Sequence, residues 1–174
     1  MIHLTPAHYT RQPWKNGKGI TTELWRLERD GRLLVRLSRA AVVEDGAFSL
    51  FPGIARNLTV LTGPGFRLTG PGLNLRCDPL VPVAFPGDVE VMASETRGQQ
   101  SDDFNVMTAK SLPKPVVQVM QNTHLPAGGV LALYALGPCR VNTRDLSRGD
   151  LILAEEAVTL TGDGPVLAIR LHGF

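Results

Sequence analysis

Short apolar runs separated by turn residues dominate the hydrophobic pattern of this chain. The runs are rich in Val, Leu and Thr, and Gly and Pro recur between them, as at residues 63–65 and 162–165. Many short strands with turn chemistry between them indicate an all-β sandwich or barrel. The only helical signal is one turn near residues 6–9. We predict strands near residues 20–28, 32–40, 57–62, 65–69, 82–85, 88–94, 104–108, 116–122, 130–135, 139–142, 151–154, 157–161 and 166–171.

Two of these predicted strands carry a mixed polar and apolar face. The two-residue period of a strand places Arg36 and Ser38 on one side, and it groups Asp103, Asn105 and Met107 in the same way. Small barrels turn such faces inward to build a ligand cavity. The alternatives are an outward, solvated face and, for the Asp and Asn, ordinary turns at a strand entry.

The chain reads as two halves of a single compact unit. Residues 1–110 form the half that carries the candidate site residues, and residues 111–174 form the other half. The proline-containing segment 111–115 connects them. Residues 58–68 resemble residues 131–141 in pattern, and each segment is followed by a Gly-Asp pair that opens a strand. This is either a divergent duplication or a coincidence in a Gly-rich β protein. The polar segment 98–103 is expected to be an exposed hairpin tip.

The tract from Pro13 to Glu23 concentrates more chemistry than any other stretch. Lys15 offers a charge for a carboxylate, Asn16 offers an amide, and Glu23 can accept a hydrogen bond from an amidine or imidazole nitrogen. An ordinary Asn-Gly turn would explain part of the tract, but not Lys15 and Glu23. Trp14 is expected to pack the loop against the mouth of a barrel.

Arg56 follows a turn into an apolar strand, and two interpretations of it stay open. Its guanidinium could form a forked contact with a ligand carboxylate, or it could close the loop through a salt bridge to Asp45 or Glu44. Phe48 and Phe51 are expected to be pocket wall or core rather than a stacking site.

Composition and charge narrow the classes of function. The 174 residues carry a formal charge of +2 with interspersed signs, so nucleic-acid binding has little support. No apolar run approaches the roughly 20 residues of a bilayer span, and the start lacks the pattern of a secretory signal. We expect a cytoplasmic protein that does not interact with a membrane. Cys77 and Cys139, distant in sequence, are expected to be reduced packing residues.

The histidines give no metal-binding pattern. His3, His8, His124 and His172 are scattered, and no His-x-His occurs. We therefore predict no bound transition metal and no cofactor, while a site assembled from distant histidines is the alternative.

Five ordered blocks of the sequence resemble the bacterial HutD/Ves family. The resemblance implies a bicupin, with two double-stranded β-helix (RmlC-like) barrels in one chain, and a role in histidine utilisation that involves binding of formimidoylglutamate or urocanate. The Ves branch is associated with stress and cold response, and neither branch implies an established activity. Lys18 departs from the family tract, where a third glycine is usual. The blocks are Pro-Trp-Lys-Asn-Gly-Lys-Gly with Thr22-Glu23 after it, Arg36-Leu37-Ser38-x-Ala40, Asp45-Gly46-x-Phe48-Ser49-x-Phe51-Pro52-Gly53-x-x-Arg56, Phe85-Pro86-Gly87-Asp88 and Asp103-Phe104-Asn105-Val106-Met107.

The leading hypothesis is a metal-free protein that senses or buffers a small anionic metabolite. The competing hypothesis is a metal-free isomerase, lyase or hydrolase that uses Glu23 as general acid or base. A Ves-like stress or cold-response role and an interaction protein without a ligand are further alternatives, and a homodimer stays open. The expected ligand-binding residues are Lys15, Asn16, Glu23, Arg36, Ser38, Arg56, Asp103 and Asn105.

Overall fold

The computed structural model describes residues 1–14 and 19–174, and in them strands provide nearly all the regular structure. The predicted all-β class is confirmed, and the predicted turn at residues 6–9 is the 3₁₀ helix η1 (Pro6–His8). The strands are β1 (Ile2–Leu4), β2 (Thr10–Pro13), β3 (Ile20–Arg29), β4 (Arg32–Val42), β5 (Gly46–Ala47), β6 (Ile54–Thr62), β7 (Phe66–Gly70), β8 (Leu73–Cys77), β9 (Val83–Pro86), β10 (Met92–Ser94), β11 (Ser101–Ala109), β12 (Val116–Met120), β13 (His124–Leu125), β14 (Val130–Ala135), β15 (Cys139–Val141), β16 (Arg144–Leu146), β17 (Leu151–Ala154), β18 (Val158–Thr161) and β19 (Val166–Leu171).

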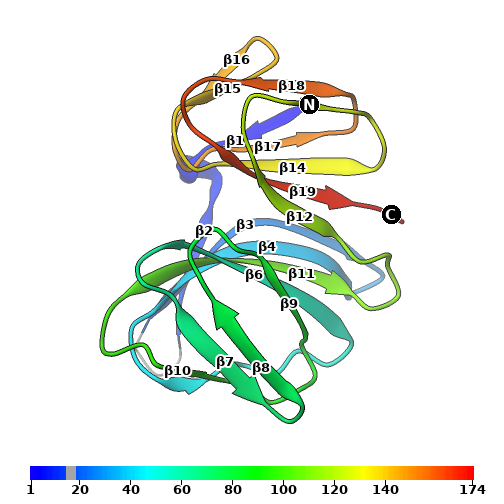
Figure 1. Cartoon of the computed structure of the whole chain (residues 1–174). Coiled ribbons are helices and arrows are strands. Elements are labelled where there is room, and N and C mark those ends of the chain that lie inside the picture. The colour runs from blue at the N-terminus through cyan, green and yellow to red at the C-terminus, as the bar shows by residue number, and fades with distance from the viewer. Residues whose placement is uncertain (15–18) are drawn as a thin grey trace. The chain divides into compact units, whose positions relative to one another are not determined.

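The strands form two compact units, each with two sheets (Figure 1). Unit 1 contains residues 1–9 and 112–174, with the strand orders β1-β17-β14-β19-β12 and β13-β18-β15-β16. Unit 2 contains residues 10–111, with the orders β2-β3-β4-β11-β6-β9 and β5-β10-β7-β8.

The two units repeat one strand topology. The order β4-β11-β6-β9 in unit 2 has its counterpart in β12-β19-β14-β17 of unit 1, and β5-β10-β7-β8 has its counterpart in β13-β18-β15-β16. The similar segments 58–68 and 131–141 therefore lie on equivalent strand pairs, β6 with β7 and β14 with β15. The Gly-Asp pairs are not equivalent, because residues 87–88 follow β9 whereas residues 149–150 precede β17.

Residues 1–9 belong to the same unit as the C-terminal part of the chain. Strand β1 pairs with β17, with Ile2 opposite Leu153, and the Tyr9 hydroxyl donates a hydrogen bond to the Gly149 carbonyl over 2.7 Å. The expected division into residues 1–110 and 111–174 differs from the structure at this point. A three-residue strand has too short a pattern to show from sequence which sheet it joins.

The expected hairpin tip at residues 98–103 is wrong from residue 101 onward. Strand β11 begins at Ser101 and lies between β4 and β6, with Ser101 and Asp103 buried. The Ser101 hydroxyl accepts a hydrogen bond from the Gly65 backbone N–H over 2.9 Å. Polar residues can therefore start this central strand, because the fold supplies their partners.

The sequence pattern overestimated the length of one other strand and missed six strands among the described residues. The predicted strand 88–94 is shortened to β10, and β1, β2, β5, β8, β13 and β16 were not predicted. Apart from β8, these missed strands have two to four residues each.

The interiors of the two units differ in chemistry. In unit 1 the core is apolar and includes Leu133, Ile152 and Leu160, whereas in unit 2 an apolar cluster around Phe66 and Leu68 fills only part of the interior. A cavity occupies another part of unit 2.

Both cysteines are buried, one in the core of each unit, as their predicted packing role requires. Burial raises the pKa of the Cys77 thiol to about 12, and it raises the pKa of Cys139 as well.

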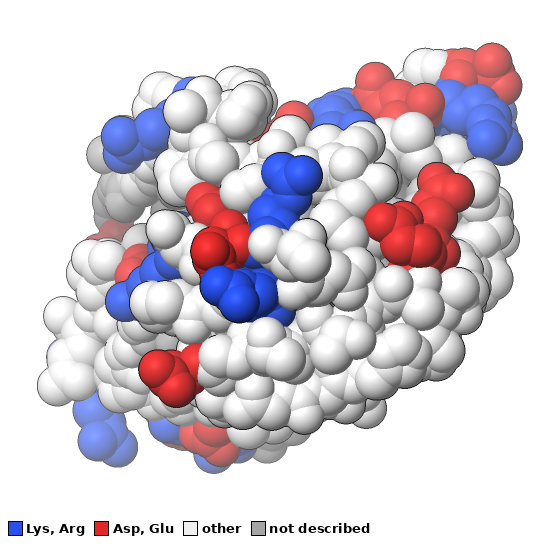
Figure 2. Space-filling view, turned by 90° about the horizontal axis from the view of Figure 1, so that it is seen from above, with Lys and Arg blue, Asp and Glu red and all other residues white. Residues whose placement is uncertain are grey.

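The surface carries charges of both signs. On the face shown in Figure 2, acidic and basic side chains lie in small separate groups among uncharged residues. Within residues 1–14 and 19–174, no helix has the length and apolar character that a bilayer crossing requires.

Candidate functional site

A cavity of about 620 Å³ lies within unit 2. Strands β2, β3, β4, β6 and β11 contribute to its wall, together with the segment that follows β4. Its lining residues are Gln12, Pro13, Trp14, Thr21, Arg36, Ser38, Ala40, Val42, Ala47, Phe48, Ser49, Phe51, Arg56, Asp103, Asn105 and Met107.

Strand register places the polar lining residues in adjacent rows across three strands. Met107 of β11 pairs with Arg36 of β4 on one side and with Arg56 of β6 on the other. One row further along, Asn105 pairs with Ser38 of β4. Neighbouring strands lie about 4.8 Å apart, so the backbones at Arg36 and Arg56 are roughly 10 Å apart on one face of the sheet. The predicted alternation on both strands therefore brings these residues to one cavity.

The guanidinium of Arg56 is buried among aromatic rings. Its central carbon lies 5.2 Å from the ring centroid of Phe48, 5.3 Å from that of Phe51 and 5.0 Å from that of Phe85. Phe48 and Phe51 also line the cavity. The pKa of Arg56 is lowered to about 10, mainly by desolvation; Asp103 opposes this shift, and the positive charge of Arg36 adds a smaller lowering effect.

Arg56 uses only part of its hydrogen-bonding capacity. Its Nη2 donates to Oδ1 of Asn105 over 2.7 Å and its Nη1 donates to the Ser49 carbonyl over 3.3 Å, while the buried Nε has no partner among the described residues. Asp45, which the sequence offered as a salt-bridge partner, instead accepts hydrogen bonds from the backbone and hydroxyl of Thr96.

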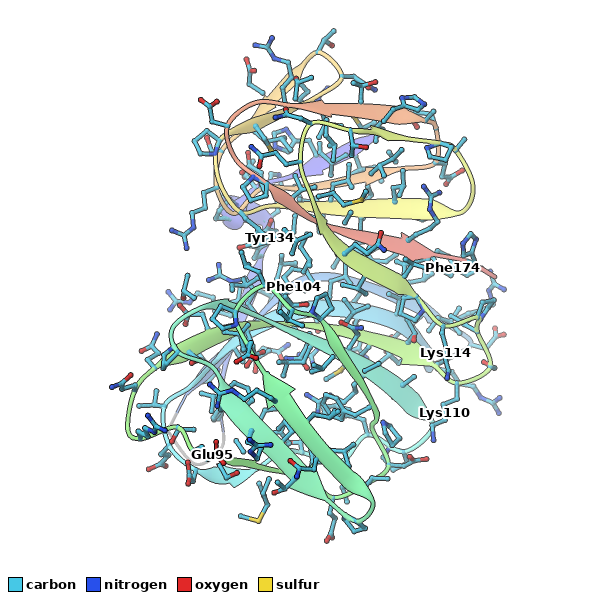
Figure 3. The ribbon with its side chains drawn as sticks, in the orientation of Figure 1. Glu95, Phe104, Lys110, Lys114, Tyr134 and Phe174 are labelled. Atoms are coloured by element: carbon cyan, nitrogen blue, oxygen red, sulfur yellow. The ribbon has the colours of Figure 1, made fainter. Side chains whose placement is uncertain are left out.

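Asn105 joins Arg56 to a buried carboxylate. Its Nδ2 donates to Oδ1 of Asp103 over 2.5 Å, and Asp103 is only 1% exposed. Burial raises the pKa of Asp103 to about 7, against the lowering effects of Arg56 and of the Asn105 hydrogen bond. Phe104, between these two residues in sequence, lies on the opposite face of β11 and is also buried (Figure 3).

Arg36 is held by a carboxylate on the adjacent strand. Its Nε donates to Oε2 of Glu23 over 2.6 Å, and Arg26 lies 3.8 Å from the same oxygen. Glu23 lies in β3, where a strand was expected, but it is not among the cavity-lining residues, whereas Arg36 is. The carboxylate is therefore engaged by two arginines.

Trp14 closes one side of the cavity. Its indole N–H donates to the Thr21 hydroxyl over 2.8 Å, and its backbone N–H donates to the Gly19 carbonyl over 2.8 Å. A Cβ atom at Gly19 would lie 2.9 Å from the indole ring, so glycine is needed here for close packing. The expected sites Lys15 and Asn16, and the unusual Lys18, lie outside the described residues.

Sequence reasoning missed several lining residues. Gln12 belongs to the unpredicted strand β2, which pairs with β3 with Gln12 opposite Thr21. Ala40 and Val42 continue the face of Arg36 and Ser38, so the same two-residue period could have found them. Ser49 contributes its backbone carbonyl, and side-chain chemistry gives no signal for such a role.

No histidine is among the described residues that line this cavity. His3, His8, His124 and His172 all belong to unit 1. His3 lies 3.1 Å from Asp150, and His8 accepts a hydrogen bond from the Thr5 backbone over 3.0 Å. In the part of the chain that the structure describes, no group of three or more His, Cys, Asp or Glu residues could hold a metal ion.

Paired sheets around a partly polar interior define a cupin-type protein. A cupin 2 conserved barrel domain protein from Leptotrichia buccalis has the same fold, with a TM-score of 0.56, 10% identity and coverage of 89% of each chain. The HutD family model matches residues 6–168, so this chain belongs to the HutD family.

Two solved structures from Pseudomonas show the family likeness. HutD from Pseudomonas fluorescens SBW25, in its formate condition, has a TM-score of 0.86 and 27% identity, with 99% of each chain covered. A conserved protein from Pseudomonas aeruginosa PAO1 has a TM-score of 0.83 and 30% identity, with coverage of 99% of this chain and 98% of that one.

Proposed function

We propose that this protein binds a small carboxylate-bearing metabolite in the unit 2 cavity. The observation that carries the proposal is the placement of Arg36 and Arg56 on either side of Met107, on one face of the sheet. Two arginines whose backbones lie two strands apart on one face suit a small dicarboxylate, because each guanidinium can form charge-assisted hydrogen bonds to a carboxylate.

Electrostatics within the cavity supports an anionic ligand. Arg36, Arg56 and Asp103 are the charged members of the lining, so the lining has a positive balance among the described residues. The charge of Arg36 lowers the pKa of Arg56, which means that the two cations repel each other across the cavity. A bound anion would relieve this repulsion.

The remaining lining would give orientation and specificity. Ser38 and Asn105 offer hydrogen-bonding groups, while Phe48, Phe51 and Met107 supply apolar walls. A metabolite of mixed character, with carboxylates at its ends and a short apolar body, fits this combination.

The family membership suggests the identity of the metabolite. We propose an anionic intermediate of histidine degradation, formimidoylglutamate or urocanate, which a cytoplasmic bicupin would sense or buffer. The repeated strand topology supports the bicupin description, with one double-stranded β-helix in each unit. The apolar core of unit 1 supports the proposal that the binding site lies in unit 2.

Isothermal titration calorimetry tests the proposal. Formimidoylglutamate, urocanate, histidine and glutamate are titrated into the native protein and into the variants Arg36→Gln and Arg56→Gln. Arg140→Gln is the matched control, because Arg140 forms an exposed ion pair with Asp145 in unit 1. We expect binding of at least one anion that weakens by tenfold or more in both cavity variants and not in the control. No heat from any compound would refute the proposal.

The enzyme alternative, with Glu23 as general acid or base, has weaker support. Glu23 is engaged by Arg36 and Arg26 and does not line the cavity. Incubation of the protein with the same compounds, followed by NMR, separates the alternatives. Unchanged ligand in the presence of binding favours the sensor, and turnover that Glu23→Gln abolishes favours the enzyme.

A further inference from the structure

We propose that the unit 2 cavity binds its carboxylate ligand together with one proton, and that Asp103 holds this proton. This inference rests on the proposed function and adds a property that neither the family nor the fold specifies. Its basis is the way in which the structure separates Asp103 from the two cavity arginines.

The two acidic side chains near the arginines have opposite environments. Glu23 contacts Arg36 directly over 2.6 Å and lies outside the cavity lining. Asp103 lines the cavity, but its only hydrogen-bond partner among the described residues is the Asn105 amide. The amide of Asn105 thus stands between the Asp103 carboxylate and the Arg56 guanidinium.

A carboxylate ligand would bring a second negative charge into the space that Asp103 already lines. Two carboxylates in one buried site cannot both stay ionised at low cost, so one of them takes up a proton. A carboxylate ligand paired with the arginines stays ionised. Asp103, which contacts no cation directly among the described residues, is the group that accepts the proton from solvent. Its hydroxyl can then donate a hydrogen bond to the ligand.

The charged and titratable groups around Asp103 come from several strands. Arg56 of β6 and Arg39 of β4 favour its ionised form, while Asp102 of β11 disfavours it. Arg36 of β4 lines the same cavity, and Cys77 of β8 interacts electrostatically with Asp103 and stays neutral because burial raises its pKa to about 12. Burial of Asp103 outweighs the cations and raises its pKa to about 7 in the free protein.

The test uses glutarate and formimidoylglutamate as probes, because the carboxylates of both stay ionised near neutral pH. Calorimetric titrations near pH 6, 7 and 8 are repeated in buffers of different ionisation enthalpy, so that the number of protons taken up is measured directly. We expect uptake that approaches one proton per ligand at the highest pH, and an affinity about tenfold weaker near pH 8 than near pH 6.

Two variants assign the proton to its residue. In Asp103→Asn the pH dependence and the proton uptake disappear, while binding continues near pH 8. Asp102→Asn is the matched control, because Asp102 is the next residue and accepts a hydrogen bond from the Thr62 hydroxyl over 2.9 Å. This control variant is expected to keep the proton uptake. Circular dichroism checks the fold of each variant. Proton uptake by the native protein on ligand binding tests the inference without any variant.

The outcomes separate this inference from the proposed function. Binding of either probe without proton uptake, or with proton release, overturns the inference and leaves the proposed function standing. Proton uptake that persists in Asp103→Asn also overturns it. Absence of binding at every pH overturns both.

Discussion

Arg36 of β4 donates a hydrogen bond from Nε to Oε2 of Glu23 on β3 over 2.6 Å. Only Arg36 of this pair lines the cavity, and its contact with the carboxylate restricts the direction of the guanidinium. We therefore infer that Glu23 is a positioning residue for Arg36, in place of the direct ligand contact that its residue type suggested. A charged pair of this kind restricts the rotamers of a long side chain before a ligand arrives.

Substitution of Glu23 distinguishes positioning from ligand contact. Glu23→Ala is expected to weaken glutarate binding about tenfold, because Arg36 loses its partner. Glu23→Gln is expected to restore most of that affinity, because its amide oxygen can still accept from Nε. Calorimetry provides the affinities.

Glu28→Gln is the control for this prediction, because Glu28 pairs with Arg26 on the exposed side of β3. One other result would assign Glu23 to ligand contact instead of positioning. If both Glu23 variants lose formimidoylglutamate but keep glutarate, Glu23 contacts the nitrogen-bearing end of the ligand.

Arg56 gives a second prediction, in which one substitution is tested for its effect on ligand affinity and for its effect on folding stability. Arg56→Met keeps an apolar stem among the aromatic rings but removes the charge and leaves Oδ1 of Asn105 without its donor. We expect at least a tenfold loss of affinity for carboxylates and a loss of about 1–2 kcal/mol in the free energy of unfolding. Urea denaturation and calorimetry measure the two effects. An affinity equal to that of the native protein would contradict a role of Arg56 in binding.

The buried Asp103 predicts how stability depends on pH. Its pKa of about 7 in the folded protein exceeds the ordinary value of 3.8, so the folded state binds more protons than the unfolded state between these values. The free energy of unfolding should therefore fall as pH rises through this window, by up to about 1.4 kcal/mol per pH unit from this residue.

Comparison of the native protein with Asp103→Asn isolates this contribution. Urea denaturation of both proteins at several values between pH 4 and pH 8 gives the two curves, and effects of exposed carboxylates cancel in their difference. The variant should gain stability relative to the native protein as pH rises. Parallel curves would show that Asp103 is ionised throughout the window in the folded state.

Close packing of Gly19 against Trp14 gives a fourth prediction. In Gly19→Ala the new methyl group would lie 2.9 Å from the indole ring, so the ring must shift away from Thr21. We expect a shift in Trp14 fluorescence, measured in a Trp25→Phe background, and carboxylate binding weakened several-fold. Gly46→Ala is the control, because no atom lies within 4 Å of its Cβ position. Equal spectra and affinities in the two variants would contradict a wall formed by Trp14.

Local pattern predicted which residues share a strand face better than it predicted their partners on other strands. The two-residue period correctly grouped Arg36 with Ser38 and Asp103 with Asn105, because side-chain direction in a strand depends only on position along that strand. The two-residue period could not show that β11 lies between β4 and β6. The alignment of Arg36, Met107 and Arg56 across the sheet is known only from the strand pairing of the structure.

The sequence pattern failed mainly to predict strands in short and polar segments. Residues 101–103 look like a turn by composition, yet they start a buried central strand because Gly65 and Asn105 supply hydrogen-bond partners. Residues 2–4 have too few positions to show a period, and they pair with β17. Gly65 and β17 are both distant in sequence from the segments that they contact.

The sequence by itself determined the all-β class, most of the long strands and the residue types available to the site. These properties follow from local turn chemistry and from alternation along single strands. Only the tertiary structure decided that Glu23 pairs with the cavity residue Arg36, that Asn105 separates Asp103 from Arg56, and that residues 58–68 and 131–141 lie on equivalent strands. It also decided that unit 2 has a cavity where unit 1 has an apolar core. Burial, and with it the pKa of Asp103, depends on how strands distant in sequence pack together.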